Sequence, residues 1–142
     1  MERGGTVDPE PSLAHWVRFP GYPPPFLMQY EWQLIWILAS HFLADFVCQP
    51  RWIGEQKSKS NRILFYHIAL YTSLMVLLLV PLGIDPRYAL LNGVIHASID
   101  FVSSRLTTYF YTKQRFQAFW NVIAADQFLH LAFLVGLLPV LS

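Results

Sequence analysis

Three aspartates lie within long apolar stretches of this sequence, and each has a histidine four residues away. The pairs are His41 with Asp45, His96 with Asp100, and Asp126 with His130. A spacing of four places both side chains of a pair on one face of a helix. Imidazole nitrogen and carboxylate oxygen are ligands that suit zinc, manganese or iron. The repeated pairs therefore predict a divalent-metal site between helices, to which His67 of a further apolar stretch adds a ligand.

A purely structural role for the same pairs is the alternative. Imidazolium–carboxylate pairs can hold membrane helices together, each contributing about 1 kcal/mol. Charge balance favours the metal: three carboxylates against Arg105 leave two negative charges if the histidines are neutral, and one divalent cation would cancel them. Because one ion cannot take so many ligands, one aspartate is a candidate general base, either Asp45 or Asp100. The predicted ligands are His41, Asp45, His67, His96, Asp100, Asp126 and His130.

The polar residues beside the predicted ligands each have two possible roles. Gln49 and Gln127 either orient the ligands by hydrogen bonds or link helices as amides. Arg105 either extends to lipid phosphate or binds an anionic group that enters from the cytoplasm. Cys48 is the only cysteine, so an internal disulfide is excluded. Gly93 and Gly136 are expected to permit close helix packing.

Four apolar stretches carry the predicted site, at residues 33–49, 63–82, 88–105 and 117–138. Each is close to the ~20 residues that a helix needs to cross a ~30 Å hydrocarbon core. Of the 142 residues, 54% are hydrophobic and only 13% are charged, whereas an ordinary soluble domain has about 25% charged residues. The predicted fold is therefore all-α, an integral membrane bundle of about four transmembrane helices.

The N-terminal region differs from the rest, because residues 1–31 hold six of the ten prolines. Proline lacks an N–H and fixes φ, which disfavours regular structure. We therefore expect a proline- and aromatic-rich tail over residues 1–31, extended or at the membrane interface, followed by a four-helix domain over residues 32–142.

Lysine and arginine predict the orientation in the membrane. The link over residues 51–62 holds four basic residues against Glu55 alone, and the link over 105–116 holds three with no acid. The positive-inside rule places both links in the cytoplasm and both termini outside. With a rise of about 1.5 Å per residue, all seven predicted ligands then lie roughly 5–20 Å from the cytoplasmic boundary.

The motifs around these residues resemble one family. His41-Phe42-Leu43-Ala44-Asp45-Phe46-Val47-Cys48-Gln49 is similar to an H-x3-D-F-x2-Q signature, and His67 matches a histidine of the second helix. His96-x3-Asp100-Phe101-x2-Ser104-Arg105 and Asp126-Gln127-x2-His130 follow in order. The resemblance covers about residues 33–138 and is to small bacterial and phage membrane proteins known as domain of unknown function DUF3307. It implies a multi-pass protein of the bacterial inner membrane and no established activity.

Three functions are compatible with the sequence. The first is a metal-dependent hydrolase that activates water against a lipid or phosphoester at the inner leaflet. The family weakly resembles such membrane hydrolases, whose helices also carry histidine and aspartate within the membrane. Their histidine-rich loop patterns are missing from this sequence. The second is a non-catalytic accessory subunit with a membrane-protein partner or a second copy of itself. The third is a proton or cation transport module, against which the apolar stretches Leu74–Val80 and Ala132–Leu138 argue. The lipid bilayer is the expected partner; the net charge of +1 predicts no nucleic-acid binding.

Overall fold

The computed structural model describes residues 25–141, with side chains over 31–138, and every regular element in that part of the chain is a helix. The long helices are α1 (Pro25–Phe42), α3 (Asn61–Leu79), α4 (Pro86–Thr112) and α5 (Phe116–Leu141). Shorter elements are the π-helix η1 (Leu43–Val47), α2 (Arg51–Gln56) and the 3-10 turn η2 (Val80–Leu82). The all-α prediction is confirmed.

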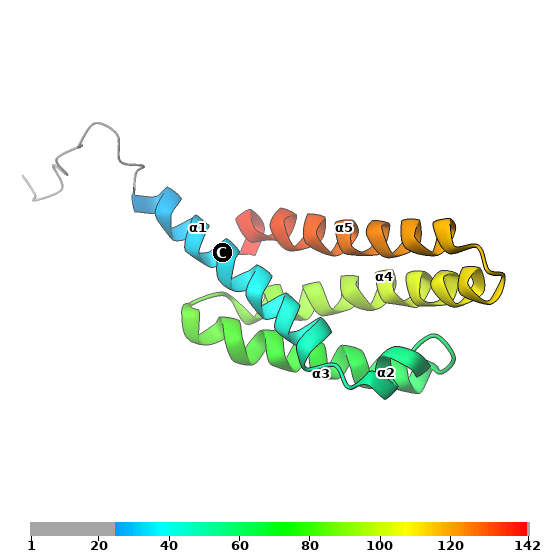
Figure 1. Ribbon diagram of the computed structural model, residues 1–142. Helices are drawn as coiled ribbons and strands as arrows, with labels where there is room; N and C mark the ends of the chain where they lie inside the picture. Colours follow the sequence, from blue (N-terminus) through cyan, green and yellow to red (C-terminus); the bar gives the residue numbers. More distant parts are fainter. Residues whose placement is uncertain (1–24, 142) are drawn as a thin grey trace, which may run out of the picture.

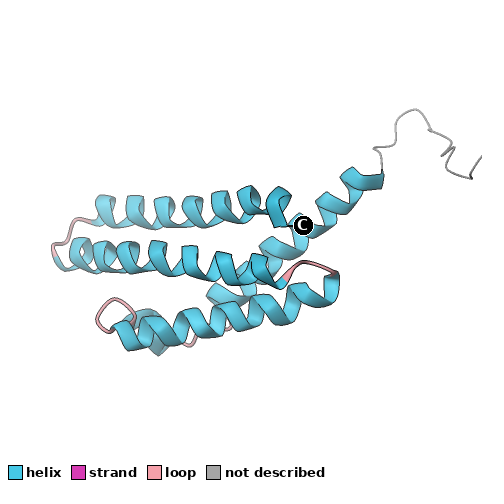
Figure 2. Cartoon of the chain, turned by 180° about the vertical axis from the view of Figure 1, so that it is seen from behind, coloured by secondary structure: helices cyan, strands magenta, loops and turns pink. Residues whose placement is uncertain are grey.

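Three of the long helices lie side by side, with α4 between α3 and α5 (Figure 1). Helix α1 crosses the others obliquely and packs against α3 and α5. The view from behind shows the same layer of three antiparallel helices (Figure 2). Helix α2 and the links before α3 and α5 lie at one end of the bundle, so the two basic links share that end, as predicted.

The turn between α3 and α4 shows how short links make antiparallel neighbours. Gly83 ends η2 with φ +81°, a left-handed conformation that glycine adopts at low cost. Asp85 then caps α4 by accepting a hydrogen bond from the Arg87 backbone N–H, and Pro86 occupies the first turn. The Arg87 guanidinium also donates to the Asp85 carboxylate, and these bonds hold the pKa of Asp85 below its usual range.

The four predicted apolar stretches lie in helices except for residues 48–49, which form a bend after η1, and three further boundaries differ. Helix α1 begins at Pro25, inside the predicted tail, because proline is tolerated in the first turn, where its missing N–H has no partner within the helix. Residues 51–56 form α2 within the predicted link, and α4 continues to Thr112, beyond the predicted end at residue 105. Residues 1–24 of the predicted tail lie outside the described residues.

Within residues 25–141, two helical spans are long and apolar enough to cross a membrane by length and composition: Asn61–Leu82 and Phe116–Leu138, with mean hydropathies of 2.2 and 1.6. Only 28% and 17% of their most apolar windows are buried. Large apolar side chains on them are open to the surroundings: Phe65 and Phe128 are each 69% exposed. The rest of the described chain therefore leaves large parts of the apolar faces of these two helices uncovered.

The apolar core fills the part of the bundle away from α2. It includes Ile37 of α1, Met75 and Leu79 of α3, and Leu134 of α5, all of them fully or almost fully buried. Tyr88 of α4 is also buried there, and its hydroxyl donates a hydrogen bond of 2.8 Å to the Leu134 carbonyl. This core fixes the spacing of the helices next to the polar cluster described below.

Gly93 allows α4 to approach α3 closely, as the sequence predicted. A Cβ at this position would overlap Oγ1 of Thr72 and come within 3.2 Å of its Cβ and Cγ2. We expect Gly93→Ala to reduce the free energy of unfolding by about 1–3 kcal/mol, the usual cost of overpacking. Thermal unfolding in detergent measures the effect.

Gly136 provides the matched control, because a Cβ there would meet no described atom within 4 Å. Among the described residues, the prediction that Gly136 serves close packing is therefore wrong. Gly136→Ala is expected to leave stability unchanged or to raise it by up to about 1 kcal/mol, since alanine is the better helix former. Equal destabilisation by both substitutions would contradict the role given to Gly93.

Candidate metal centre

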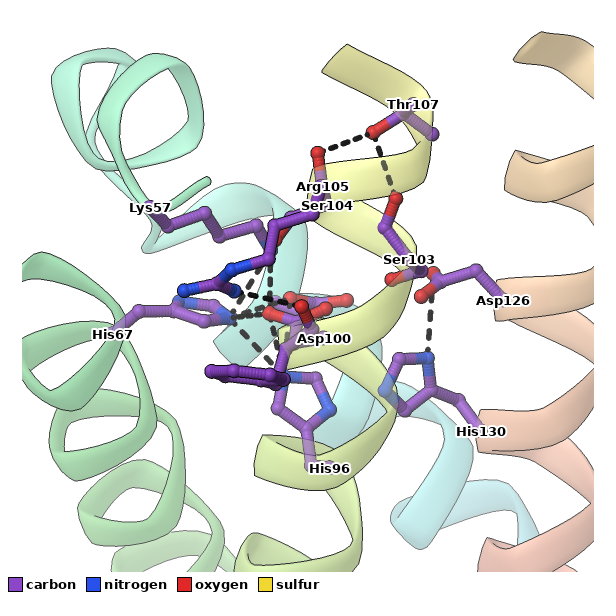
Figure 3. A network of polar contacts seen from close by, with 12 residues as sticks. Lys57, His67, His96, Asp100, Ser103, Ser104, Arg105, Thr107, Asp126 and His130 are labelled. Carbon is purple, nitrogen blue, oxygen red and sulfur yellow. Dashed lines mark hydrogen bonds and ion pairs between the residues drawn. The ribbon is translucent and has the colours of Figure 1, made fainter. Parts of the chain in front are cut away.

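Seven histidine and aspartate side chains meet in the bundle, and they come from the long helices α1, α3, α4 and α5 and the short π-helix η1. Figure 3 shows five of them: His67, His96, Asp100, Asp126 and His130. Their gathering follows from the helical repeat: in α4, buried residues recur every fourth position at Asn92, His96, Asp100 and Ser104. Asp45 lies in the π-helix η1, and π-helical turns inside α-helices are often found at functional sites. The predicted convergence of the polar faces is therefore present in the fold.

Four of these side chains form one compact, buried group: Asp45, His67, His96 and Asp100. Nε2 of His67 lies 3.1 Å from Nε2 of His96, 3.2 Å from Oδ1 of Asp45 and 3.0 Å from Oδ2 of Asp100. Nε2 of His96 lies 3.6 and 3.7 Å from the same two oxygens. Ligand atoms around a tetrahedral ion with bonds of about 2.0–2.1 Å are about 3.3–3.4 Å apart. Five of the six distances among these two nitrogens and two oxygens are therefore close to the spacing of a tetrahedral site, and the sixth is within 4.8 Å.

A second group shares a residue with the first. Asp100, Asp126 and His130 each offer a ligand atom, and these atoms lie within 4.8 Å of one another. Nδ1 of His130 is 3.4 Å from Oδ2 of Asp126. The imidazoles of His96 and His130 adjoin the shared aspartate, with ring centroids 4.3 Å apart. The seven predicted ligands therefore divide into two groups that meet at Asp100, with His41 outside both.

His41 has a different environment from the other histidines. Its Nδ1 lies 3.0 Å from the hydroxyl of Tyr71, which in turn donates to Oδ1 of Asn92 at 2.7 Å. The ring of Tyr71 also stacks on that of His96, with centroids 3.9 Å apart and planes 5° from parallel. Tyr71 and Asn92 are thus site residues that sequence reasoning missed. Both are four residues from a predicted ligand, Tyr71 after His67 and Asn92 before His96, and this spacing could have found them.

Lys57 is the most important residue that the sequence prediction missed. It comes from the link after α2 and extends toward Asp100, as Figure 3 shows. Its Nζ lies 2.6 Å from Oδ2 of Asp100 and 3.5 Å from Nε2 of His67, and its side chain is only 15% exposed. In the sequence, Lys57 is one of several basic residues of a polar link, where lysine ordinarily signals orientation in the membrane.

Two of the three predicted pairs within a helix are present. Nε2 of His96 lies 3.7 Å from Oδ2 of Asp100, and Nδ1 of His130 lies 3.4 Å from Oδ2 of Asp126. The pairing of His41 with Asp45 is replaced by contacts to α3: His41 with Tyr71, and Asp45 with His67. The π-helical turn begins between the two residues at Leu43, which changes the regular four-residue alignment of their side chains.

The predicted supporting residues have separate outcomes. Gln127 donates a 2.9 Å hydrogen bond to Oδ2 of Asp126, which fits an orienting role. Gln49 lies against Gly54 of α2, and its buried Oε1 has no hydrogen-bond partner among the described residues. Arg105 donates to Oδ1 of Asn61 and to the Phe101 carbonyl. The cation beside the carboxylates is therefore Lys57 rather than Arg105, and the balance of two excess negative charges is unchanged.

Two pockets adjoin the cluster and share residues with each other. A polar pocket of about 170 Å³ is lined by Lys57, Asp100 and Asp126 together with hydroxyl side chains such as Ser104 and Thr107. A mostly apolar groove of about 380 Å³ lies between α4 and α5. Asp126 and Ser103 line both.

Comparison with known proteins gives one match. A family model described as "Protein of unknown function (DUF3307)" matches residues 33–141. No curated protein and no solved structure matches the chain. The matched residues include both groups of ligands, the polar pocket and all the long helices except the start of α1.

Proposed function

The chain belongs to the DUF3307 family of proteins of unknown function, and we propose that it is a multi-pass membrane protein with a divalent-metal centre between its helices. One observation carries the metal assignment: two imidazole nitrogens and two carboxylate oxygens, all buried, are close to the spacing of the ligands of a tetrahedral ion in five of their six distances. This donor set suits zinc, manganese or iron. Asp45 and Asp100 both belong to this ligand set, so a general-base role for either stays a prediction.

The distribution of polar residues supports four membrane spans, although α1 and α4 are less apolar than α3 and α5. Helix α4 buries a stripe of polar residues, Asn92, His96, Asp100 and Ser104, whereas Val94 is 65% exposed and Val102 is 55% exposed. Ionisable residues within membrane helices almost always face the bundle interior in this way. With the two basic links in the cytoplasm, the centre lies on the cytoplasmic side and both termini lie outside.

The adjoining pockets support a hydrolytic activity on a lipid or another phosphoester. A bound divalent ion lowers the pKa of a coordinated water and stabilises charge on a phosphoryl oxygen. Lys57 brings a positive charge to the wall of the polar pocket, where an anionic headgroup would lie, and Ser104 and Thr107 bring hydroxyl groups. The groove between α4 and α5 would take the apolar chain.

The ion pair between Lys57 and Asp100 also supports a second candidate, an accessory subunit in which the cluster only fixes the packing. Removing one partner of a buried ion pair typically costs 3–5 kcal/mol, because the other charge is left without compensation. If Lys57 is the sole counter-ion of Asp100, its loss should destabilise the protein by about that amount. If a metal is bound, Lys57 competes with the metal for the same carboxylate.

Substitution of Lys57 distinguishes the two candidates. We expect Lys57→Met to tighten binding of zinc or manganese at least about tenfold, since repulsion between two unit charges ~4 Å apart is about 4 kcal/mol at an effective dielectric constant of 20, well above the 1.4 kcal/mol that a factor of ten requires. Isothermal titration of detergent-purified protein, stripped of metal by a chelator, measures the affinity. Lys59→Met, an exposed lysine of the same link, is the matched control and should leave the affinity unchanged.

Weaker binding by Lys57→Met than by wild-type protein would contradict the metal assignment. Absence of binding in both proteins, together with a large loss of thermal stability in Lys57→Met alone, would favour the accessory subunit.

A further inference from the structure

We propose that the centre holds two divalent ions, with Asp100 as a ligand of both. This inference rests on the proposed metal-binding function and extends it. The first ion belongs to Asp45, His67, His96 and Asp100, and the second to Asp100, Asp126 and His130. The sequence pattern suggests one shared ion, but the side chains are distributed over two adjacent groups.

The second group has buried polar atoms that lack hydrogen bonds within the described residues. Nε2 of His130 and Oδ1 of Asp126 have no hydrogen-bond partner, and Nδ1 of His130 makes no hydrogen bond but lies 3.4 Å from Oδ2 of Asp126. The side chain of His130 is only 3% exposed, and Asp126 is 13% exposed. A buried polar group without a partner carries a large desolvation cost, and such a group needs an explanation such as a bound ion. A metal ion would satisfy a His130 nitrogen and the free oxygen of Asp126 together.

The shared aspartate is placed to join the two ions. The carboxylate of Asp100 has two oxygens, and Oδ2 lies beside the imidazoles of His67 and His96. On its other side are Asp126 and His130 of α5, as Figure 3 shows. Ions in two-metal hydrolytic sites are about 3.5–4 Å apart, a separation that one carboxylate can bridge. The ring centroids of His96 and His130, one from each group, lie only 4.3 Å apart.

The two ions would have different surroundings, and the difference identifies the substrate class. Four protein ligands close the first site, as in sites where zinc has a structural role. The second site has three protein ligands, the number that leaves a position open for water or substrate in catalytic sites. Asp100 and Asp126 line the polar pocket, so this open position faces it. A paired metal centre beside Lys57 fits a phosphoester, because two ions and an ammonium group stabilise the charge of a transferring phosphoryl group.

Manganese binding tests the two-ion centre directly. Full-length protein in detergent, stripped by a chelator and then loaded with Mn²⁺, is expected to bind two ions per chain and to give the electron paramagnetic resonance spectrum of a spin-coupled pair. Asp126→Asn and His130→Gln are each expected to bind one ion per chain and to give the spectrum of an isolated Mn²⁺. Glu55→Gln, the same kind of change in an exposed carboxylate of α2 that belongs to neither group, is the matched control and should keep both ions.

The possible outcomes separate this inference from the function on which it rests. One ion per chain in wild-type protein, unchanged in Asp126→Asn and His130→Gln, would overturn the two-ion centre and leave the four-ligand site intact. No bound ion in wild-type protein would overturn both. Two ions per chain with the spectra of isolated, uncoupled Mn²⁺ would overturn the bridging role of Asp100.

Discussion

Asp100→Asn is expected to lower the metal affinity of both sites by more than about 100-fold, so that neither site is effectively occupied. Asparagine keeps the shape of the side chain but removes the negative charge and one oxygen ligand. Because Asp100 belongs to both groups of ligands, no other single substitution should have an equal effect. Loss of a residue that only supports a ligand typically reduces metal affinity 10- to 100-fold, so loss of a shared ligand should cost more. Equilibrium dialysis with Zn²⁺ or Mn²⁺ measures the affinity.

Two variants define the specificity of that result. Asp45→Asn removes a ligand from the four-residue group alone and should leave the second ion bound. His41→Gln removes an imidazole that contacts Tyr71 and belongs to neither group, so both ions should remain. Stoichiometric metal in folded Asp100→Asn would contradict the shared role of this carboxylate. Equal loss of metal in His41→Gln would mean that the centre is organised around different ligands.

Removal of the metal is expected to lower the stability of the wild-type protein by about 4 kcal/mol, if the ion was present at about 1,000 times its dissociation constant. For a protein of this size, the loss corresponds to a fall in Tm on the order of 10 °C. The physical reason is charge: without the ion, the buried carboxylates of Asp45 and Asp100 face each other across His67, with Lys57 as the nearby cation. A thermal melt in detergent, with and without a chelator, measures the shift.

Asp100→Asn provides the control for this melt as well. Its Tm should not respond to the chelator, because it has no ion to lose, whereas any nonspecific effect of the chelator on the micelle would appear in both proteins. A wild-type Tm that is the same with and without chelator would show that no ion contributes to the fold.

The sequence could predict that the ligand residues come together, because their positions on each helix face depend on local geometry. In a helix, residues four apart share a face, and the apolar stretches fix how deep each face lies. His67, His96, Asp100, Asp126 and His130 therefore meet as the sequence indicates. The same reasoning predicted three pairs within helices, but the contacts between helices, such as that of His67 with Asp45, depend on packing that the repeat does not encode.

The residues that were missed depend on tertiary structure. Lys57 reaches Asp100 only because α2 turns the chain back at the end of the bundle, and a lysine in a basic link has no local pattern that distinguishes it. The π-helical turn at Leu43–Val47 likewise has no clear signal in the sequence, yet Asp45 lies within it and contacts α3. Arg105 shows the opposite case. From the sequence it counts as the cation that offsets the carboxylates, but it donates to Asn61 and to the Phe101 carbonyl. The cation beside Asp100 is Lys57.

Bound metal per chain is the measurement that tests the central claim most directly. Wild-type protein is purified in detergent and analysed by inductively coupled plasma mass spectrometry, beside His96→Ala and Asp126→Ala. The proposal predicts at least one zinc, manganese or iron ion per wild-type chain and less in His96→Ala. With the second ion present, Asp126→Ala also holds less than the wild-type protein. A folded wild-type protein that holds no stoichiometric metal, and takes none up when zinc, manganese or iron is added, would contradict it.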